Sequence, residues 1–249
     1  MTEPKHKQQT YRKQHKSHLA IMTTLLNLLN ASIECNNLGV VLLHAGDLEN
    51  ALDSFMTAAK LMHPVSKQIQ SCSVDDDCEN FWEPGFEIPQ GIRRIVQESV
   101  TSIAIKGKRP AVNAFVCAEP IHLELVSRLP EACILESAVV VHNMALAYHL
   151  QDSDQYLKRA LALYDTVFNL SCSLNTDKLA STLAMSALNN AGQIYHALGE
   201  YHISRRYLDA LRVYILKLPL PVDSHTVEVR QRFLLNAALL RPPTVASAA

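Results

Sequence analysis

The stretch NNLGVVLLHAGDL at residues 36–48 recurs in altered form as NNAGQIYHALGEY at residues 189–201. Both copies contain two glycines at the same internal spacing, Gly39 with Gly46 and Gly192 with Gly199. A small residue inside a helix lets a second helix approach closely, and a glycine after a helix adopts the left-handed conformation that ends it. The recurrence therefore predicts a repeated unit of two packed helices joined by a tight turn.

A third and more divergent copy starts at His142-Asn143-Met144-Ala145, with Tyr148 at the position of Tyr195 in the last copy. After the turn of the first copy, apolar residues recur at the spacing of one helical face: Leu48, Ala51, Leu52, Phe55, Ala58 and Ala59. With these residues the sequence resembles the tetratricopeptide-repeat (TPR) family, whose unit of about 34 residues is a pair of antiparallel helices. The resemblance implies an all-α fold, a TPR-like superhelix of helical hairpins.

The prolines mark where helices should end. None of the eleven prolines lies in residues 5–63 or 131–218, and a proline inside a helix costs about 3 kcal/mol. Hydrophobic residues make up 48% of the chain and aromatic residues only 6%, a balance that favours helix-on-helix packing over a β-sandwich. We therefore expect helices on both sides of a proline-rich middle, with Pro64 at the end of the first repeat.

These signals predict one TPR-like domain at residues 19–249 behind a basic, flexible tail at residues 1–18. Its expected parts are a cap helix (19–30), a repeat (32–65), an insertion (66–130), two further repeats (136–171 and 185–218), a second cap helix (225–240) and a frayed tail (244–249). Caps are expected because the end repeat of a solenoid otherwise exposes its apolar seam.

The insertion differs in composition from the repeats around it. Its first part holds the acidic run Asp75-Asp76-Asp77, for which we expect a solvated loop at residues 71–80. Its second part has β-prone runs at residues 99–105 and 114–117, joined by KGKRP at residues 106–110. This pattern predicts a short β-hairpin beside the helices.

Charge and motif content point away from nucleic acid, membranes and catalysis. The net charge of −1 supplies no field that would gather phosphate groups, so no nucleic-acid partner is expected. Polar residues interrupt residues 19–43 too often for a membrane span, and without a secretory signal pattern we expect a cytoplasmic or nuclear protein. The sequence has no nucleophile elbow, P-loop, dinucleotide fingerprint, HExxH motif or paired CxxC motif. We therefore expect a non-enzymatic protein without a cofactor.

The resemblance also implies a binding face, because the concave face of a TPR superhelix is formed by the first helix of each pair. Here that face would present Asn36, Val40, Leu43, His44, His142, Asn143, Leu146, His149, Asn189, Asn190, Gln193 and His196. The set has no Lys or Arg, whereas TPR domains that capture the C-terminal carboxylate of chaperones use Lys and Arg together with Asn. A carboxylate clamp of that type is therefore not expected. Neutral amides and imidazoles instead suit the N–H and C=O groups of a peptide backbone.

The leading hypothesis is a scaffold that binds a peptide segment of another protein in a neutral groove lined by Asn and His. Two alternatives stay open. The histidines His142, His149 and His196 could hold a metal ion or a small ligand in a regulatory protein, or the chain could be a structural subunit of a larger complex. The Asn and His side chains could also satisfy only one another between adjacent helices.

Overall fold

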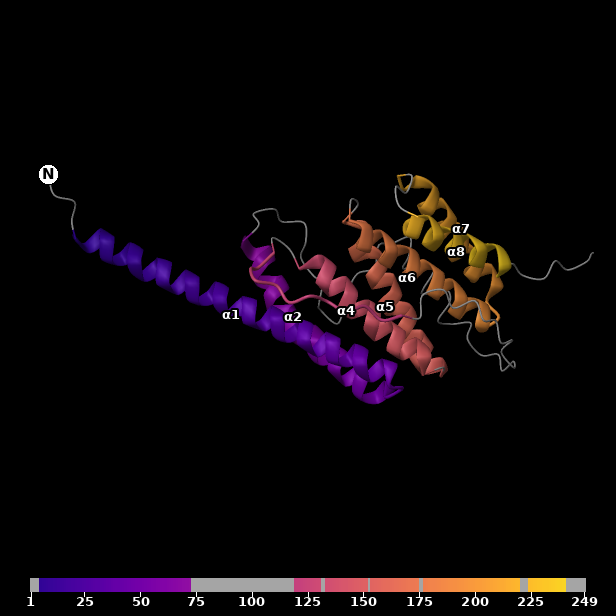
Figure 1. The fold of residues 1–249 in the computed structure, drawn as a ribbon, viewed down its shortest axis with the longest axis horizontal. Coiled ribbons are helices and arrows are strands. Elements are labelled where there is room, and N and C mark those ends of the chain that lie inside the picture. Colours follow the sequence, from indigo (N-terminus) through magenta and orange to yellow (C-terminus); the bar gives the residue numbers. More distant parts are fainter. Residues whose placement is uncertain are drawn as a thin grey trace, which may run out of the picture.

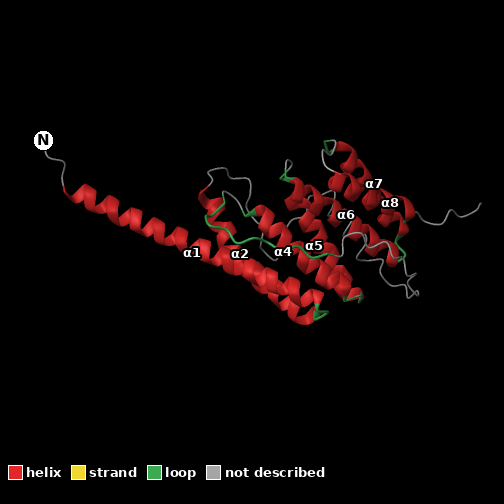
Figure 2. Ribbon diagram, viewed as in Figure 1, coloured by secondary structure: helices red, strands yellow, loops and turns green. Residues whose placement is uncertain are grey.

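The computed structural model describes residues 5–72, 119–130, 133–151, 153–174, 177–219 and 224–240. Within these ranges every regular element is an α-helix (Figure 2). The predicted all-α, TPR-like superhelix is confirmed. The β-hairpin predicted at residues 99–105 and 114–117 lies outside the described residues, as does most of the acidic loop.

The helices form three antiparallel pairs and one extra helix (Figure 1). They are α1 (Lys5–His44), α2 (Leu48–Cys72), α4 (Ile134–Leu150), α5 (Asp154–Cys172), α6 (Lys178–Ala197), α7 (Tyr201–Lys217) and α8 (Ser224–Leu239). Within the pairs α1 packs on α2, α4 on α5 and α6 on α7, and α8 packs on both helices of the last pair. Because each pair contacts its neighbours along the chain, the arrangement is a short solenoid.

Three residues separate the two helices of every pair. In the first and last turns Gly46 and Gly199 have φ angles of 79° and 80°, the left-handed conformation that the sequence predicts there. The middle turn has no such glycine. Its Ser153 side chain accepts a hydrogen bond from the Tyr156 backbone N–H and so caps α5. Turn chemistry therefore differs while turn length is kept.

The other two repeat glycines permit close helix packing. A Cβ atom added at Gly39 would lie 2.6 Å from Cε1 of Phe55, on the opposite helix of the pair. At Gly192 the same addition would lie 3.0 Å from Cδ2 of Leu208. Both glycines thus lie where a large side chain of the second helix packs against the backbone of the first helix.

The first helix is longer than the sequence predicts. Residues 5–18 were expected as a flexible tail and residues 19–30 as a separate cap helix, but both belong to α1, which runs unbroken to His44. The physical reason is that no proline or glycine occurs between Lys5 and Leu38. The N-terminal half of α1 extends away from the other helices (Figure 1). None of the described helices combines the length and apolar composition that a membrane crossing needs.

Pro64 does not end the first repeat as expected. It lies inside α2, which continues to Cys72 and takes in the first residues of the predicted acidic loop. The proline ring removes one backbone donor from the helix. On both sides of it, however, Met62 and Val65 are fully buried in the cluster that joins α1 to α2. Tertiary packing therefore carries the helix past the proline.

Candidate peptide-binding face

The first helices of the three pairs, α1, α4 and α6, form what we call the inner face of the solenoid. Residues 119–130, the end of the expected insertion, lie across this face in an extended conformation without regular secondary structure (Figure 2). We call these residues the inner-face segment. Its backbone is bound by side chains of the helices, so the inner face already holds a stretch of polypeptide.

Two asparagines of α1 bind the middle of the segment. Asn37 Nδ2 donates to the Leu123 carbonyl at 2.8 Å, and Asn37 Oδ1 accepts from the Leu123 N–H at 2.9 Å. Asn30 makes the same pair of bonds to Val126, at 3.0 and 2.9 Å. Seven helical residues rise about 10 Å, which equals the length of about three extended residues, so both pairs form in one register.

An asparagine of α4 binds the segment in the same way. Asn143 Oδ1 accepts from the Ile121 N–H at 2.8 Å, and its Nδ2 donates to the Ile121 carbonyl at 2.7 Å. The Ile121 carbonyl also accepts from Asn36 Nδ2 at 3.1 Å, while Asn36 Oδ1 accepts from Asn143 Nδ2 at 2.9 Å. Asn36 and Asn143 are fully buried, so α1, α4 and the segment share one closed network of amides.

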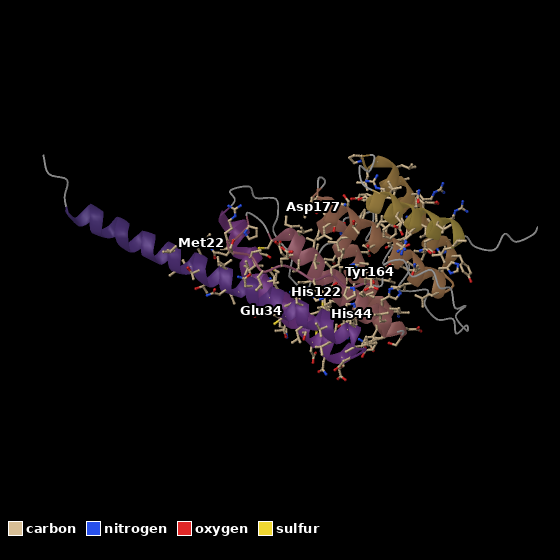
Figure 3. All side chains as sticks on the ribbon, viewed as in Figure 1. Met22, Glu34, His44, His122, Tyr164 and Asp177 are labelled. Atoms are coloured by element: carbon tan, nitrogen blue, oxygen red, sulfur yellow. The ribbon has the colours of Figure 1, made fainter. Side chains whose placement is uncertain are left out.

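The side chains of the segment divide between helices and solvent. Ile121, Leu123, Val126 and Leu129 are half-buried and pack against the apolar clusters of the helices. The residues between them are exposed: His122, labelled in Figure 3, Glu124, Leu125, Ser127 and Arg128. The segment is thus held by backbone pairing and by aliphatic side chains on one side.

Charge contributes little to this contact. His44 Nε2 lies 3.4 Å from Glu119 Oε2 at the start of the segment, and the two side chains are 53% and 90% exposed. An ion pair so exposed to water adds at most about 1 kcal/mol. Neutral amide groups therefore dominate the recognition of the segment.

Three of the predicted binding residues lie in the core instead of on the surface of the inner face. Val40, Leu43 and Leu146 are buried in a cluster with Ala51 and Phe55. They join the first pair of helices to the second. Their apolar spacing in the sequence follows from this packing.

The predicted histidines of α4, His142 and His149, lie around Tyr164 of α5. His149 Nδ1 lies 3.2 Å from the Tyr164 hydroxyl, and the His142 ring centroid lies 6.1 Å from the centroid of the Tyr164 ring. Complete burial lowers the pKa of His142 to about 4, so this imidazole is neutral at physiological pH. His196 of α6 instead packs edge-on against Tyr201 at 5.0 Å. Within the described ranges no group of three His, Cys, Asp or Glu side chains is placed to hold a metal ion.

The predicted amides of α6 bond to neighbouring helices. Asn190 Nδ2 donates to the Tyr164 hydroxyl at 3.2 Å, and its Oδ1 accepts from Asn189. Asn189 Oδ1 accepts in turn from Asn236 of α8. Asn189 and Asn190 are fully buried, whereas Gln193, one turn further along, is half-buried.

Asn30 and Asn37, two of the three asparagines that pair with the segment backbone, were not among the predicted binding residues. The signal for Asn37 was present, because the repeat alignment places it opposite Asn143 and Asn190. Asn30 lies two helical turns before Asn37 and therefore on the same face of α1. Its role follows only from the path of the segment, which the repeats do not encode.

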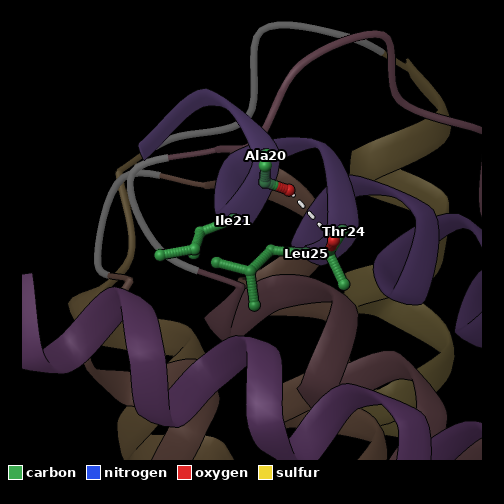
Figure 4. Close-up of a pocket in the computed structure, with 4 residues that line it drawn as sticks. All are labelled: Ala20, Ile21, Thr24 and Leu25. Carbon is green, nitrogen blue, oxygen red and sulfur yellow. Dashed lines mark hydrogen bonds between the residues drawn. The ribbon is translucent and has the colours of Figure 1, made fainter. Parts of the chain in front are cut away.

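A surface hollow on α1 is a weaker candidate for a binding site than the inner face. Ala20, Ile21, Thr24 and Leu25 line a space of about 290 Å³ (Figure 4). All four residues belong to one helix, and the Thr24 hydroxyl donates to the Ala20 carbonyl at 2.9 Å. The hollow lacks polar groups converging from several elements, which is the usual mark of a ligand site.

Comparison with known protein families gives a match. A family model described as tetratricopeptide repeat matches residues 184–218, which cover most of α6 and all of α7. Searches among curated proteins and among solved structures each returned no match. The resemblance inferred from the repeated glycines and asparagines is thereby confirmed.

Proposed function

We propose that this protein, a TPR-like helical member of the tetratricopeptide-repeat family, is a non-enzymatic scaffold that binds an extended segment of a partner protein on its inner face. A tetratricopeptide repeat by itself suggests a protein-interaction scaffold, because stacked helix pairs create extended binding surfaces. The family does not say what is bound or where. Those points rest on the inner face.

The observation that carries the proposal is the paired bonding of Asn30, Asn37 and Asn143 to the inner-face segment. An asparagine amide has one carbonyl acceptor and one NH₂ donor, which match the N–H and C=O of a single extended residue. Every residue except proline offers both groups. A row of such amides therefore binds extended backbone without requiring a particular side chain or charge.

Of the binding residues predicted from the sequence, Asn36, His44 and Asn143 contact the segment and stay assigned to the face. Asn30 and Asn37 join them. On α6, the half-buried Gln193 and His196 stay proposed members of this face. The face carries no cationic cluster among these positions, which fits a neutral backbone ligand better than a terminal carboxylate.

The test must account for the segment that already occupies the face. A substitution at Asn37 weakens the binding of a partner and of the chain's own segment alike, so in the wild-type chain the two effects cancel. We therefore use the full chain with Ile121→Ser and Leu123→Ser, which removes two half-buried aliphatic contacts of the segment and keeps every asparagine. This variant selects binders from a library of random 12-residue peptides, and fluorescence anisotropy gives their affinities.

Adding Asn37→Ala to this variant should weaken the binding of the selected peptides about thirtyfold, because two backbone hydrogen bonds of roughly 1 kcal/mol each are lost. Asn50→Ala is the matched control, since Asn50 bonds only locally to Asp47 at the turn before α2. It should leave the affinities unchanged. Peptides that bind equally well with and without Asn37 would show that binding uses another surface.

A further inference from the structure

We propose that the inner-face segment is a built-in competitor, and that the partner is an extended segment with aliphatic side chains at the spacing of Ile121, Leu123 and Val126, which binds by displacing it. This inference rests on the proposed function. It adds the chemical class of the partner and a mode of regulation for the same face.

The segment is bound as a separate ligand would be. The backbone groups of Ile121, Leu123 and Val126 bond to side-chain amides of α1 and α4, with no helix or sheet ladder of the segment's own. The asparagines of α1 lie more than 80 positions away in the sequence. A partner with the same extended backbone would meet the same donors and acceptors in the same order.

The spacing of the aliphatic residues follows from where the asparagines hold the backbone. The side chains of the three paired residues turn toward the helices, as does that of Leu129, and Leu123 contacts both the main core cluster and the cluster around Leu29 and Ile33. The residues between them are exposed and differ in chemistry. The face therefore selects an aliphatic residue at the first, third and sixth positions and tolerates any residue between them.

The degree of burial indicates that the segment can leave. Its aliphatic side chains are only half-buried, whereas the core residues beneath them, such as Leu29 and Ile33, are fully buried. Leu125 on its outer side is 58% exposed. The cluster beneath the segment also joins α1 to α2 through residues such as Ala58 and Met62, so these helix-to-helix contacts remain when the segment leaves and uncovers amides and apolar surface.

Competition from within the chain is strong because the segment is tethered beside its site. A short tether gives an effective concentration in the millimolar range, far above that of a free partner. The apparent dissociation constant of the partner is its intrinsic value divided by the fraction of chains with a free face. A partner should therefore bind weakly to the wild-type chain and much more tightly when the segment is disabled.

The experiment supplies the segment in trans. The probe is a fluorescein-labelled synthetic peptide with the sequence of residues 118–130, AEPIHLELVSRLP, and the receptors are full-length chains. We compare the wild type, the Ile121→Ser/Leu123→Ser variant, and a control with His122→Ser and Glu124→Ser at exposed positions of the segment. The variant should bind the probe at least tenfold more tightly than the wild type or the control. A probe with serine at its Ile121 and Leu123 positions should bind at least tenfold more weakly.

Three results would overturn the inference. Equal affinity of wild type and variant for the probe would remove the competition while leaving the proposed function intact. A variant that binds library peptides lacking the aliphatic pattern would remove the stated partner class. A stable wild-type dimer in light scattering that Ile121→Ser/Leu123→Ser dissociates would assign the face to a second copy of the chain. If neither the probe nor any library peptide binds the variant, the proposed function itself fails.

Folding of the variant is checked by circular dichroism and thermal melting. If the double substitution unfolds the chain, Val126→Ser replaces it, because Val126 contacts only the cluster around Leu29 at the outer end of the segment. Val126→Ser should raise the affinity for the probe about threefold, which is less than the gain expected for the double variant, because it removes only one of the three paired aliphatic side chains. No gain with a folded Val126→Ser chain would contradict the inference.

Discussion

The first two helix pairs and the last pair place the same residue at the same position and use it differently. Asn37, Asn143 and Asn190 occupy equivalent positions of α1, α4 and α6. The first two bond to the backbone of an extended segment, at Leu123 and Ile121. Asn190 bonds to a tyrosine of the preceding pair and to its neighbour Asn189, which is itself held by α8.

What covers the asparagines differs between the two ends of the solenoid. At the C-terminal end α8 is a folded helix whose Phe233 and Ala237 are buried in the main core cluster, together with Leu240 just after the helix. At the N-terminal end the cover is an extended segment with half-buried side chains. An asparagine at this repeat position thus links helices where a helix covers it. It binds peptide backbone where an extended segment covers it.

The two covers should contribute very different stabilities, which is the largest effect we predict. Phe233→Ala removes a fully buried ring and should lower the free energy of unfolding by about 4 kcal/mol. Leu123→Ala removes a half-buried side chain and should cost about 1 kcal/mol. Urea unfolding followed by circular dichroism measures both. Similar losses would mean that the segment belongs to the core as fully as α8 does.

A buried carboxyl group should make the C-terminal half sensitive to pH. Asp165 of α5 accepts from the Tyr207 hydroxyl of α7 at 3.0 Å, and burial raises its pKa from 3.8 to about 7, against a smaller lowering by that hydrogen bond. The folded chain therefore holds a proton that the unfolded chain releases above pH 4, so this group's contribution to stability falls as the pH rises from about 4 to about 7.

Asp165→Asn removes this titration and keeps an acceptor for Tyr207. Relative to the wild type, the variant should gain on the order of 3 kcal/mol between pH 4.5 and pH 8. Burial of neutral His142 makes the free energy of unfolding rise between pH 4 and 6.5. This effect is the same in the wild type and in Asp165→Asn, so it cancels in the difference between their stabilities. Unfolding curves at several pH values give that difference. A difference that does not change with pH would show that Asp165 is ionised in the folded chain.

An added methyl group at the contact between the two helices of a pair should destabilise the first pair more than the last pair. Gly39→Ala places a Cβ against the Phe55 ring and should cost about 2 kcal/mol. Gly192→Ala meets Leu208 at 3.0 Å, a contact that a small shift relieves, and the gain in helix propensity of about 1 kcal/mol offsets it. Melting temperatures report the order. A larger loss at Gly192 would contradict this account of the two seams.

The repeated glycines and asparagines were sufficient to predict the repeat, and the four glycines define the helix pairs because each acts within its own pair. Gly46 and Gly199 end their helices by local backbone geometry, and Gly39 and Gly192 admit a residue at a fixed distance along the chain. Local rules failed at Pro64, where burial of Val65 sustains the helix. They also failed at the start of α1, which was expected to be a tail.

The site was predicted less completely than the fold. The sequence indicated amides suited to a backbone and named Asn36 and Asn143, but it could not place residues 119–130 on the inner face, because that contact joins distant parts of the chain. It also selected Val40 and Leu146, which are buried in the core. Apolar residues at helical spacing look alike whether they face a ligand or another helix.

Hydrogen exchange at single amides, followed by NMR, tests the central claim most directly. The amides of Ile121, Leu123 and Val126 donate to asparagine side chains and should be protected in the wild-type chain, while the exposed residues between them exchange freely. Asn37→Ala should raise exchange at Leu123 about tenfold and leave Ile194, buried in α6, unchanged. Unprotected amides at all three positions in the wild type would contradict the account.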